Sequence, residues 1–299
     1  MLACGPFADI TVSIVTYNSQ DVIGDCLKSL PEGVAVRVFD NASSDGTVEL
    51  IHSQFPAVQL VASDENVGFG CGHNANLEQI ATPYSLVLNP DCFLNATALT
   101  EMVSILRGHA NVALVGPGDG ETAVQTDSYQ DMETGEPNPH HVEQLSGHCL
   151  LMRMSAFDEI GFFDPNLFLF YEDTDLCTKA RLSGHILVQA PNTGVTHLIG
   201  QSTPTTRKTT NARDFHLGWS EAYYRCKYRG DSARSIELFR AAFKHFRKAF
   251  VRLLRLSPKT VESLFRIRGV IDYAVSGPSP SAVQELAEAG GVSDARKAA

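Results

Sequence analysis

Short apolar runs alternate with longer amphipathic stretches along the first 120 residues of the chain. The apolar runs are rich in Val, Ile and Leu, and they predict buried strands at 10–17, 34–40, 58–62, 84–89 and 112–116. Segments of helical length separate the strands, among them 19–30 and 96–107. Strand, helix and strand at this spacing indicate βαβ units, and therefore an α/β fold whose mostly parallel central sheet has helices on both faces.

Polar residues follow each predicted strand, and in parallel sheets ligands bind beyond the carboxyl ends of the strands. These segments read TYNS, DNASSDG, DEN and NPD in chain order. No G-x-G-x-x-G follows the first strand and no P-loop motif occurs, which argues against a dinucleotide-binding Rossmann enzyme. An acidic edge binds a phosphorylated ligand through a divalent cation with oxygen ligands. Asp91, directly after Pro90, is a candidate for such a ligand, and a simple Asn-Pro-Asp turn is the alternative.

An aromatic run at 167–171, LFLFY, leads directly into Glu172, Asp173 and Asp175. Acidic side chains are rarely buried unless they are paired, hydrogen-bonded or bound to a metal. Desolvation and like-charge repulsion should raise the pKa of at least one of them, which suits a general base. The alternative is an acidic start to a helix at 173–183, stabilised by the helix dipole.

Composition and charge narrow the functional classes. The 299 residues are 43% hydrophobic and 19% charged, which is enough for a sizeable core. Residues 1–230 carry 27 acidic and 12 basic side chains, so we expect no nucleic-acid partner. Seven scattered cysteines without a C-x-x-C pair favour a reducing compartment over a disulfide framework or a zinc site. No signal peptide or membrane-spanning run is visible, so a cytoplasmic location is expected.

Six motifs occur in order over residues 12–177: VSIVTYNS, VFDNASSDGT, ENVGFGCGHN, LVLNPDC, SGHCLLMRMSAFDEIGFFD and FYEDTDLC. Together they resemble the family 2 glycosyltransferases of the GT-A (nucleotide-diphospho-sugar transferase) fold, especially the bacterial rhamnosyltransferase branch. HLIGQST at 197–203 and FHLGWSEAYYRCKYRG at 215–230 extend the likeness to about residue 230. The resemblance implies a catalytic domain over 1–230, with a nucleotide-sugar half at 8–116 and an acceptor half at 117–230.

The resemblance also implies roles for individual residues. Asp91 would ligate Mg²⁺ or Mn²⁺ at the donor diphosphate, and His197 either completes the metal shell or is a structural histidine. Asp173 is the first candidate for the catalytic base and Glu172 the second. The residues implied in binding the nucleotide-sugar donor are Thr16, Asn18, Asp40, Asn66, Gly68, Asn89 and Asp91. Those implied at the acceptor are His148, Tyr171 and Asp175, of which Asp175 is also suited to anchoring the helix that follows it.

Two positions depart from the family pattern and leave the acceptor details open. The usual GGFD is Gly161-Phe162-Phe163-Asp164 here, and Lys179 stands where an Arg is usual, which would weaken a bidentate ion pair. The apolar run at 162–171 is expected to line the acceptor cleft, with about half of its side chains in the core.

The implied reaction is inverting transfer of L-rhamnose from dTDP-L-rhamnose to a growing bacterial surface polysaccharide or lipid-linked glycan. Inversion is expected because one base and direct displacement suffice without a protein nucleophile. Three alternatives stay open: the same reaction with a UDP-hexose or another nucleotide sugar, a glycoside hydrolase that uses paired acids, and a catalytically inactive sugar-binding module. Dependence on nucleotide and Mn²⁺ separates a transferase from a hydrolase, and turnover separates it from the module.

The segment 231–275 predicts a basic amphipathic helical extension. Five apolar residues recur there at 4-3-4-3 spacing: Phe239, Phe243, Phe246, Phe250 and Leu253. Five cations occupy other faces of the same predicted helix at 232–256: Arg240, Lys244, Arg247, Lys248 and Arg255. Such a helix either binds an anionic membrane, which would place the protein peripherally on the inner face of the cell membrane, or packs its stripe on the catalytic domain or a second subunit of a homo-oligomer. The tail at 276–299 is small and polar and is expected to be disordered.

Overall fold

The computed structural model describes residues 5–118, 141–190, 195–198, 200–203, 205–230 and 233–278. Two compact units make up the chain. The first contains Met1–Asp64, Cys71–Asp164 and Asp173–Thr203, and the second contains Glu65–Gly70, Pro165–Glu172 and Pro204–Ala299. The tail predicted to be disordered lies outside the described residues from position 279 onward.

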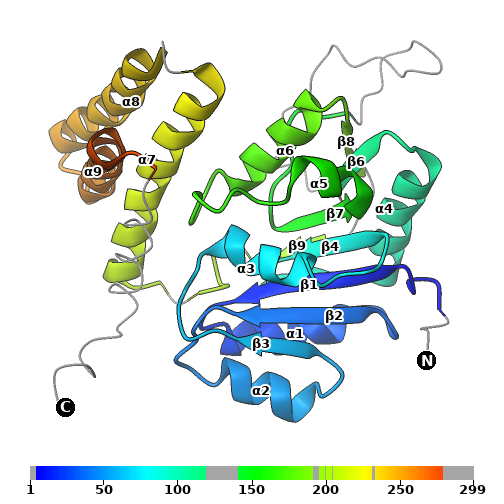
Figure 1. Ribbon diagram of the computed structural model, residues 1–299. Coiled ribbons are helices and arrows are strands. Elements are labelled where there is room, and N and C mark those ends of the chain that lie inside the picture. The colour runs from blue at the N-terminus through cyan, green and yellow to red at the C-terminus, as the bar shows by residue number, and fades with distance from the viewer. Residues whose placement is uncertain are drawn as a thin grey trace, which may run out of the picture. The chain divides into compact units, whose positions relative to one another are not determined.

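The first unit is built on a seven-stranded sheet with the strand order β3-β2-β1-β4-β7-β6-β8 (Figure 1). Neighbouring strands are parallel except at β7, which is antiparallel to both β4 and β6. The five strands predicted from apolar runs are confirmed, and so is the mostly parallel sheet. Their bounds are β1 (Ile10–Thr16), β2 (Ala35–Asp40), β3 (Gln59–Ala62), β4 (Tyr84–Leu88) and β6 (Val112–Pro117), and the sheet also contains β7 (Cys149–Arg153) and β8 (Ile186–Ala190).

Alternating side chains of β1 show how helices cover both faces of this sheet. Ile10, Val12 and Ile14 join the main core, to which α1 and α4 also contribute. On the opposite face, Ser13 contacts His73 and α3 packs close to Val15. The helices are α1 (Gln20–Ser29), α2 (Thr47–Gln54), α3 (Phe69–Leu77), α4 (Ala96–Gly108), α5 (Met154–Ile160) and α6 (Glu172–Leu182). The predicted helices at 19–30 and 96–107 are therefore confirmed as α1 and α4.

A small second sheet joins β5 (Cys92–Leu94) to β9 (Val195–His197) in antiparallel register, with Cys92 opposite His197. Because β5 follows β4 after a short turn, this sheet lies next to the carboxyl end of β4. The pairing brings residues from two distant parts of the sequence to the edge of the main sheet where ligands of parallel sheets bind.

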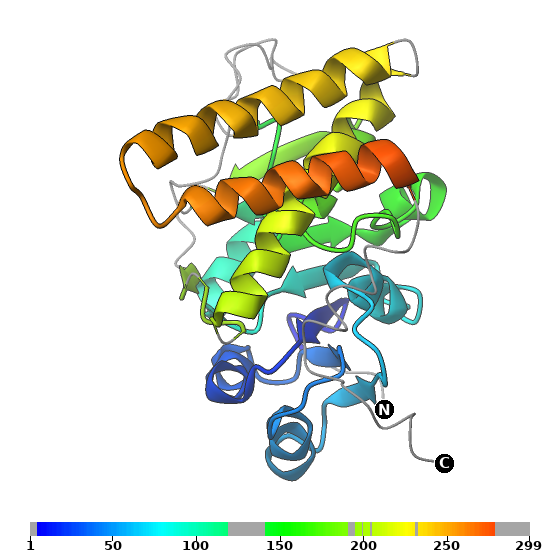
Figure 2. The same cartoon turned by 90° about the vertical axis from the view of Figure 1, so that its left-hand side faces the viewer.

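Three long helices dominate the second unit: α7 (Arg207–Arg229), α8 (Arg234–Leu254) and α9 (Thr260–Ser276). Figure 2 shows α8 and α9 side by side across α7. The crossing of α7 and α9 requires glycine, since a Cβ on Gly218 would lie 2.0 Å from the carbonyl oxygen of Arg266. Trp219 is buried in this helix cluster against Tyr223 and Tyr273. Within the described ranges, no helix combines the length and apolarity needed to cross a bilayer.

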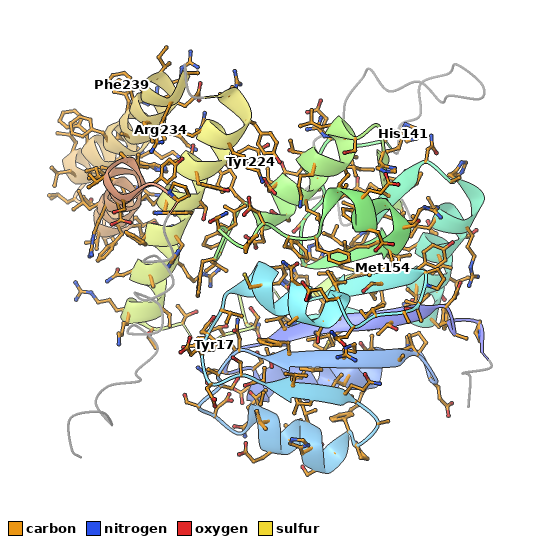
Figure 3. All side chains as sticks on the ribbon, in the orientation of Figure 1. Tyr17, His141, Met154, Tyr224, Arg234 and Phe239 are labelled. Carbon is orange, nitrogen blue, oxygen red and sulfur yellow. The ribbon has the colours of Figure 1, made fainter. Side chains whose placement is uncertain are left out.

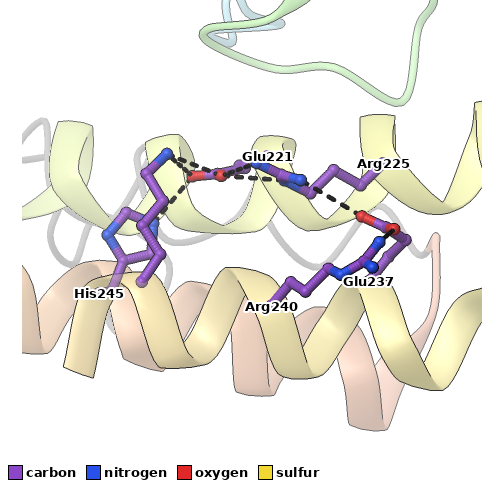
Figure 4. Close-up of polar contacts among 6 residues, drawn as sticks. Glu221, Arg225, Glu237, Arg240 and His245 are labelled. Atoms are coloured by element: carbon purple, nitrogen blue, oxygen red, sulfur yellow. Dashed lines mark hydrogen bonds and ion pairs between the residues drawn. The ribbon is translucent and has the colours of Figure 1, made fainter. Parts of the chain in front are cut away.

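A buried ionic network fixes α8 against α7 (Figure 4). Glu221 on α7 has a side chain that is 1% exposed, and it accepts hydrogen bonds from Lys244 at 2.8 and 3.0 Å. Nε2 of His245 lies 2.9 Å from the same carboxylate. Glu237 on α8 accepts hydrogen bonds from Arg225 and Arg240 at 3.3 and 2.5 Å. Burial alone would raise the pKa of Glu221, but the hydrogen bonds from His245 and Lys244 outweigh it and lower the pKa to about 2.

We predict that Glu221→Gln lowers the free energy of unfolding by about 3 kcal/mol at neutral pH, because it leaves Lys244 and His245 without a charged acceptor. A depressed pKa stabilises the fold above the ordinary glutamate value of 4.5, and that contribution is lost as the pH falls toward 2. The difference between variant and wild type should therefore shrink in acid. This difference in unfolding free energy is measured by urea unfolding. The signal is the fluorescence of Trp219, which is the one tryptophan in the sequence and lies in the second unit.

Asp272→Asn is the control for this variant, because Asp272 is a half-exposed carboxylate on α9 of the same unit and forms no ion pair with a residue that the structure describes. Removing such a charge changes stability little, so the control should shift the unfolding free energy by less than about 1 kcal/mol. Equal effects of the two substitutions would show that the Glu221 network does not hold α8 in place.

Candidate active site

Asp91 lies in the tight connection between β4 and β5 and is 1% exposed. Its Oδ2 accepts a hydrogen bond from the backbone N–H of Ser202 at 3.0 Å. Its Oδ1 lies 3.4 Å from Nε2 of His197, and no described residue donates a hydrogen bond to Oδ1. His197 reaches this place because the β5–β9 register sets it opposite Cys92. The structure thus brings together the two residues predicted to hold a metal.

The chemistry of this cluster fits a divalent cation. The ligand atoms of Asp91, Cys92 and His197 all lie within 4.8 Å of one another. Cys92 offers a sulfur atom, which is a soft ligand that hard cations such as Mg²⁺ bind poorly. Oδ1 of Asn89 is also buried and accepts no hydrogen bond from a described residue. Carboxylate and imidazole are therefore the groups that suit Mg²⁺ or Mn²⁺ here.

The ring of His148 stacks on the ring of His197, with 4.6 Å between the ring centroids and 10° between the planes. Nδ1 of His148 lies 2.9 Å from Oγ of Ser146, and its carbonyl oxygen accepts a hydrogen bond from the N–H of Asn89. His148 was predicted as an acceptor contact, and the structure places it directly beside the candidate metal ligands.

Thr16, Asn18 and Asp40 come together where β1 and β2 end. Asp40 is buried and accepts hydrogen bonds from Oγ1 of Thr16 at 2.8 Å and from the N–H of Ser43 at 2.9 Å. Oδ1 of Asn18 accepts a hydrogen bond from the N–H of Ser44 at 2.7 Å. These contacts order the loop after β2, and they join the three residues that were predicted to bind the nucleotide.

Asp173 lies in the first turn of α6, half-buried against the segment that leads into β7. Its Oδ2 accepts a hydrogen bond from the N–H of Gly147 at 2.9 Å, and its Oδ1 accepts one from the N–H of Thr174 at 2.6 Å. A Cβ on Gly147 would lie 3.2 Å from Cβ of Asp173, so glycine allows the close approach. Burial raises the pKa of Asp173 although these hydrogen bonds lower it. The raised pKa expected within the acidic motif thus occurs at Asp173, and burial is its main cause.

Four further predicted site residues belong to the second unit: Asn66, Gly68, Tyr171 and Glu172. Gly68 has φ +90°, and a Cβ there would lie 2.5 Å from the carbonyl oxygen of Phe168. Only glycine therefore fits this turn, whose N–H at Gly68 donates to Oδ1 of Asn66.

Phe170 and Tyr171 both have positive φ, at 67° and 66°. Consecutive left-handed aromatic residues are strained, and such strain is typical of functional segments. Phe163, Leu167 and Phe168 are buried while Phe170 and Tyr171 are partly exposed, which agrees with the expected division of this run between core and surface.

The two other acids of the motif lie in α6 with Asp173. Glu172 is 8% exposed at the start of the helix, and Asp175 is fully buried one turn further on. The burial of Asp175 within α6 suits the expected role of anchoring this helix.

Lys179 has a local role that sequence reasoning missed. Its Nζ donates hydrogen bonds to the carbonyl oxygens of Gly161 and Phe162. The two positions that depart from the family pattern, Lys179 and the Gly161-Phe162 segment, therefore contact each other. Ser202 was also missed, although it lies in the HLIGQST motif: its N–H binds Asp91 and its carbonyl oxygen accepts a hydrogen bond from Oγ of Ser19.

Residues 11–161 match Glycosyl transferase family 2. The chain belongs to this family. N-acetylglucosaminyl-diphospho-decaprenol L-rhamnosyltransferase of Mycobacterium tuberculosis is 27% identical over 302 residues, which cover 82% of this chain and 97% of that protein. Low-salt glycan biosynthesis hexosyltransferase Agl10 of Haloferax volcanii is 23% identical over 192 residues, which cover 58% of this chain and 62% of that protein.

Solved structures confirm the GT-A type of fold for this family 2 glycosyltransferase. The mannosyltransferase PcManGT of Pyrobaculum calidifontis, in complex with GDP-Man and Mn²⁺, superposes with a TM-score of 0.58 at 16% identity and covers 90% of this chain and 88% of its own. TarS of S. aureus, residues 1–349, superposes with a TM-score of 0.52 at 17% identity, with 93% and 82% covered.

We predict that Asp173→Asn lowers the turnover of sugar transfer roughly 10²–10⁴-fold, which is what a general base contributes. In wild type, turnover should fall on the acid side at a pH above the ordinary aspartate value of 3.8, because burial raises the pKa and the base is protonated earlier. Rates measured between about pH 4 and pH 9 test both statements, since this window spans the acid limb of a carboxylate base. Asp158→Asn, an exposed aspartate on α5, is the control and should leave turnover unchanged. Near-normal turnover of Asp173→Asn would transfer the role to Glu172.

Proposed function

We propose that this protein is an inverting, metal-dependent glycosyltransferase that moves L-rhamnose from dTDP-L-rhamnose onto a growing bacterial surface polysaccharide or lipid-linked glycan. The observation that carries the proposal is the buried carboxylate of Asp91, whose Oδ1 lies 3.4 Å from His197 and accepts no hydrogen bond from the described part of the chain. The mycobacterial relative aligns over 97% of its length and is named as an L-rhamnosyltransferase that acts on a decaprenol-diphosphate-linked sugar. Its name supports L-rhamnose as the transferred sugar and a polyprenyl-diphosphate-linked acceptor.

Asp91 and His197 would hold Mg²⁺ or Mn²⁺. When bound, the cation neutralises the charge that develops on the leaving nucleotide diphosphate. Both proposed ligands are already held in place by other residues. The N–H of Ser202 donates a hydrogen bond to Oδ2 of Asp91, and the ring of His148 stacks on the ring of His197. Ligands that do not need to reorganise make binding tighter and better oriented.

The donor's nucleotide would lie at the ends of β1 and β2, against Thr16, Asn18 and Asp40. Asp40 still has acceptor capacity for a base N–H, because a carboxylate offers about four lone-pair sites and its contacts come from Thr16 and Ser43. Asn66, Gly68 and Asn89 are proposed to contact the sugar and diphosphate, while His148, Tyr171 and Asp175 are proposed on the acceptor side.

Asp173 would take the proton from the attacking hydroxyl of the acceptor. The N–H groups of Gly147 and Thr174 fix the carboxylate in one orientation, and burial brings its pKa closer to the pH at which a base works well. The hydroxyl then displaces the nucleotide diphosphate directly, and the anomeric configuration inverts. Gly147 precedes His148 in sequence, so the proposed base and the proposed metal ligands are braced by one short segment.

We predict that Asp91→Ala abolishes transfer and removes the increase in melting temperature that nucleotide plus Mg²⁺ gives the wild type. The reason is that the variant lacks the carboxylate proposed to link cation and diphosphate. Circular dichroism should show an unchanged fold. Asp25→Ala removes an exposed aspartate in the same unit and should behave like wild type in every assay. Metal-dependent transfer by Asp91→Ala would overturn the assignment of Asp91.

We also predict that dTDP-L-rhamnose gives the largest thermal stabilisation in a panel with UDP-glucose, UDP-N-acetylglucosamine and GDP-mannose, each with Mg²⁺. A ligand at about 100 times its Kd stabilises the folded state by about 2.7 kcal/mol, which is readily measured. A larger shift with a UDP-sugar would assign the donor to that class instead. Stabilisation without transfer to any polyprenyl-diphosphate-linked acceptor would identify an inactive sugar-binding module.

A further inference from the structure

The outer face of α8 is apolar and exposed. We use this name for Phe239, Phe243, Phe246, Phe250 and Leu253, which the sequence places at 4-3-4-3 spacing. The four phenylalanines are 68%, 54%, 61% and 53% exposed, and Leu253 is 58% exposed. Figure 3 places Phe239 on the side of α8 that is turned away from α7. The second unit therefore does not bury this stripe in its own helix cluster.

The face of α8 that packs on the neighbouring helices is polar or small instead. Glu237, Ala241, His245 and Ala249 are the buried residues of the helix, at regular spacing of four. The Glu221 network holds this face inward, because Lys244 and His245 both bind the buried Glu221 of α7. The orientation of α8 is thus fixed by buried ionic contacts, and the phenylalanines point outward as a consequence.

Arg234, the first residue of α8, lies over the ring of Tyr273, and the other Lys and Arg residues of α8, with Arg255 at its C-cap, divide into two groups. Arg240, Lys244 and Arg252 form ion pairs with Glu237, Glu221 and Glu262, so their charges are compensated. Arg247, Lys248 and Arg255 are exposed and form no ion pair with any residue that the structure describes. Arg255 stands between Leu254 and Leu256, which are 70% and 89% exposed. Uncompensated positive charge therefore accompanies the apolar face along the helix.

We propose that the outer face of α8 binds an anionic lipid surface. Phenylalanines at the boundary between headgroups and acyl chains bury apolar area that water now covers, and nearby Lys and Arg are attracted to anionic headgroups. A second copy of the chain fits the same face poorly. Pairing of two copies through this face would set Arg247 and Lys248 of each copy against another cationic helix, because the acidic residue of α8, Glu237, is buried. The proposal does not depend on which sugar the enzyme transfers.

Cosedimentation with vesicles tests the proposal on the full-length protein. Wild type should bind vesicles of phosphatidylglycerol and phosphatidylcholine, and it should bind pure phosphatidylcholine at least about tenfold more weakly, because the neutral surface offers no attraction to the cations. Binding to the anionic vesicles should fall as salt rises, because salt screens exposed charges beyond a Debye length of about 8 Å at physiological ionic strength. Wild type that ignores anionic vesicles, or binds both kinds equally, would overturn the proposal.

The double variant Arg247→Glu/Lys248→Glu should lower the partition coefficient about tenfold or more, since each basic residue near an anionic surface contributes about fivefold. Arg207→Glu/Lys208→Glu is the matched control, because it reverses another exposed Arg-Lys pair at the start of α7 in the same unit. This control should bind vesicles like wild type. If the two variants lose vesicle binding equally, the loss reflects the overall charge of the protein. That result would overturn a specific role for α8.

Phe243→Ser/Phe246→Ser tests the apolar part separately and should also lose vesicle binding. Trp219 fluorescence and donor-induced thermal stabilisation should stay as in wild type, because neither phenylalanine is buried in the helix cluster. Loss of self-association in this variant, with wild type not binding vesicles, would assign the face to a second copy. Unfolding of the variant would show that the stripe packs within the protein, and both results would overturn the proposal.

Discussion

The pairing of Cys92 in β5 with His197 in β9 is the contact on which the candidate site depends. It joins the turn after β4 to a segment far along the chain, and it sets the imidazole of His197 beside the carboxylate of Asp91. The same register brings Ser202 within reach of Oδ2 of Asp91, and Ser202 in turn accepts a hydrogen bond from Ser19 after β1. Three loops at the carboxyl edge of the sheet are therefore held by one short antiparallel ladder.

Asp91 is the costly residue in this arrangement. A buried carboxylate with one N–H donor and a histidine at 3.4 Å is incompletely satisfied, and burying a charge without full compensation is destabilising. A hydrophobic or amide side chain would cost less in the same turn, so this cost is the physical reason for proposing Asp91 as a functional residue. The segment 146–149 adds to the same centre: Gly147 holds Asp173, and His148 stacks on His197. Displacement of this segment would disturb the proposed base and the proposed metal ligands together.

The sequence predicted the parts of the fold that short-range patterns determine. The strands were visible because both faces of the sheet are covered, so Val12, Ile14 and their neighbours form nearly continuous apolar runs, interrupted by small polar residues such as Ser13. Asp40 and Asp91 could be placed at the ligand edge because each follows such a run. Contacts between distant residues, such as the stacking of His148 on His197, depend on tertiary packing and could not be derived from pattern alone. The three-residue strand β9 was not predicted either, since VTH is too short to show any period, and the boundary of the catalytic domain at residue 230 stays a prediction.

The helix α8 reverses the usual relation between polarity and burial. A surface helix normally turns its apolar stripe to the core and its charges to water. Here Glu237 and His245 are buried, while Phe239 and Phe246 are more than half exposed. The spacing of apolar and charged residues along the sequence is the same for both orientations, which is why the sequence left two alternatives open. Glu221 on α7 binds Lys244 and His245 and so turns the phenylalanines away from the helix cluster of the second unit. A membrane and another protein surface both stay predictions for the partner of this stripe. Exposed phenylalanines are unfavourable in water, and the proposed lipid contact would remove that cost. Arg247 and Lys248 would then face the headgroups, which is why the proposal names an anionic surface instead of a neutral one.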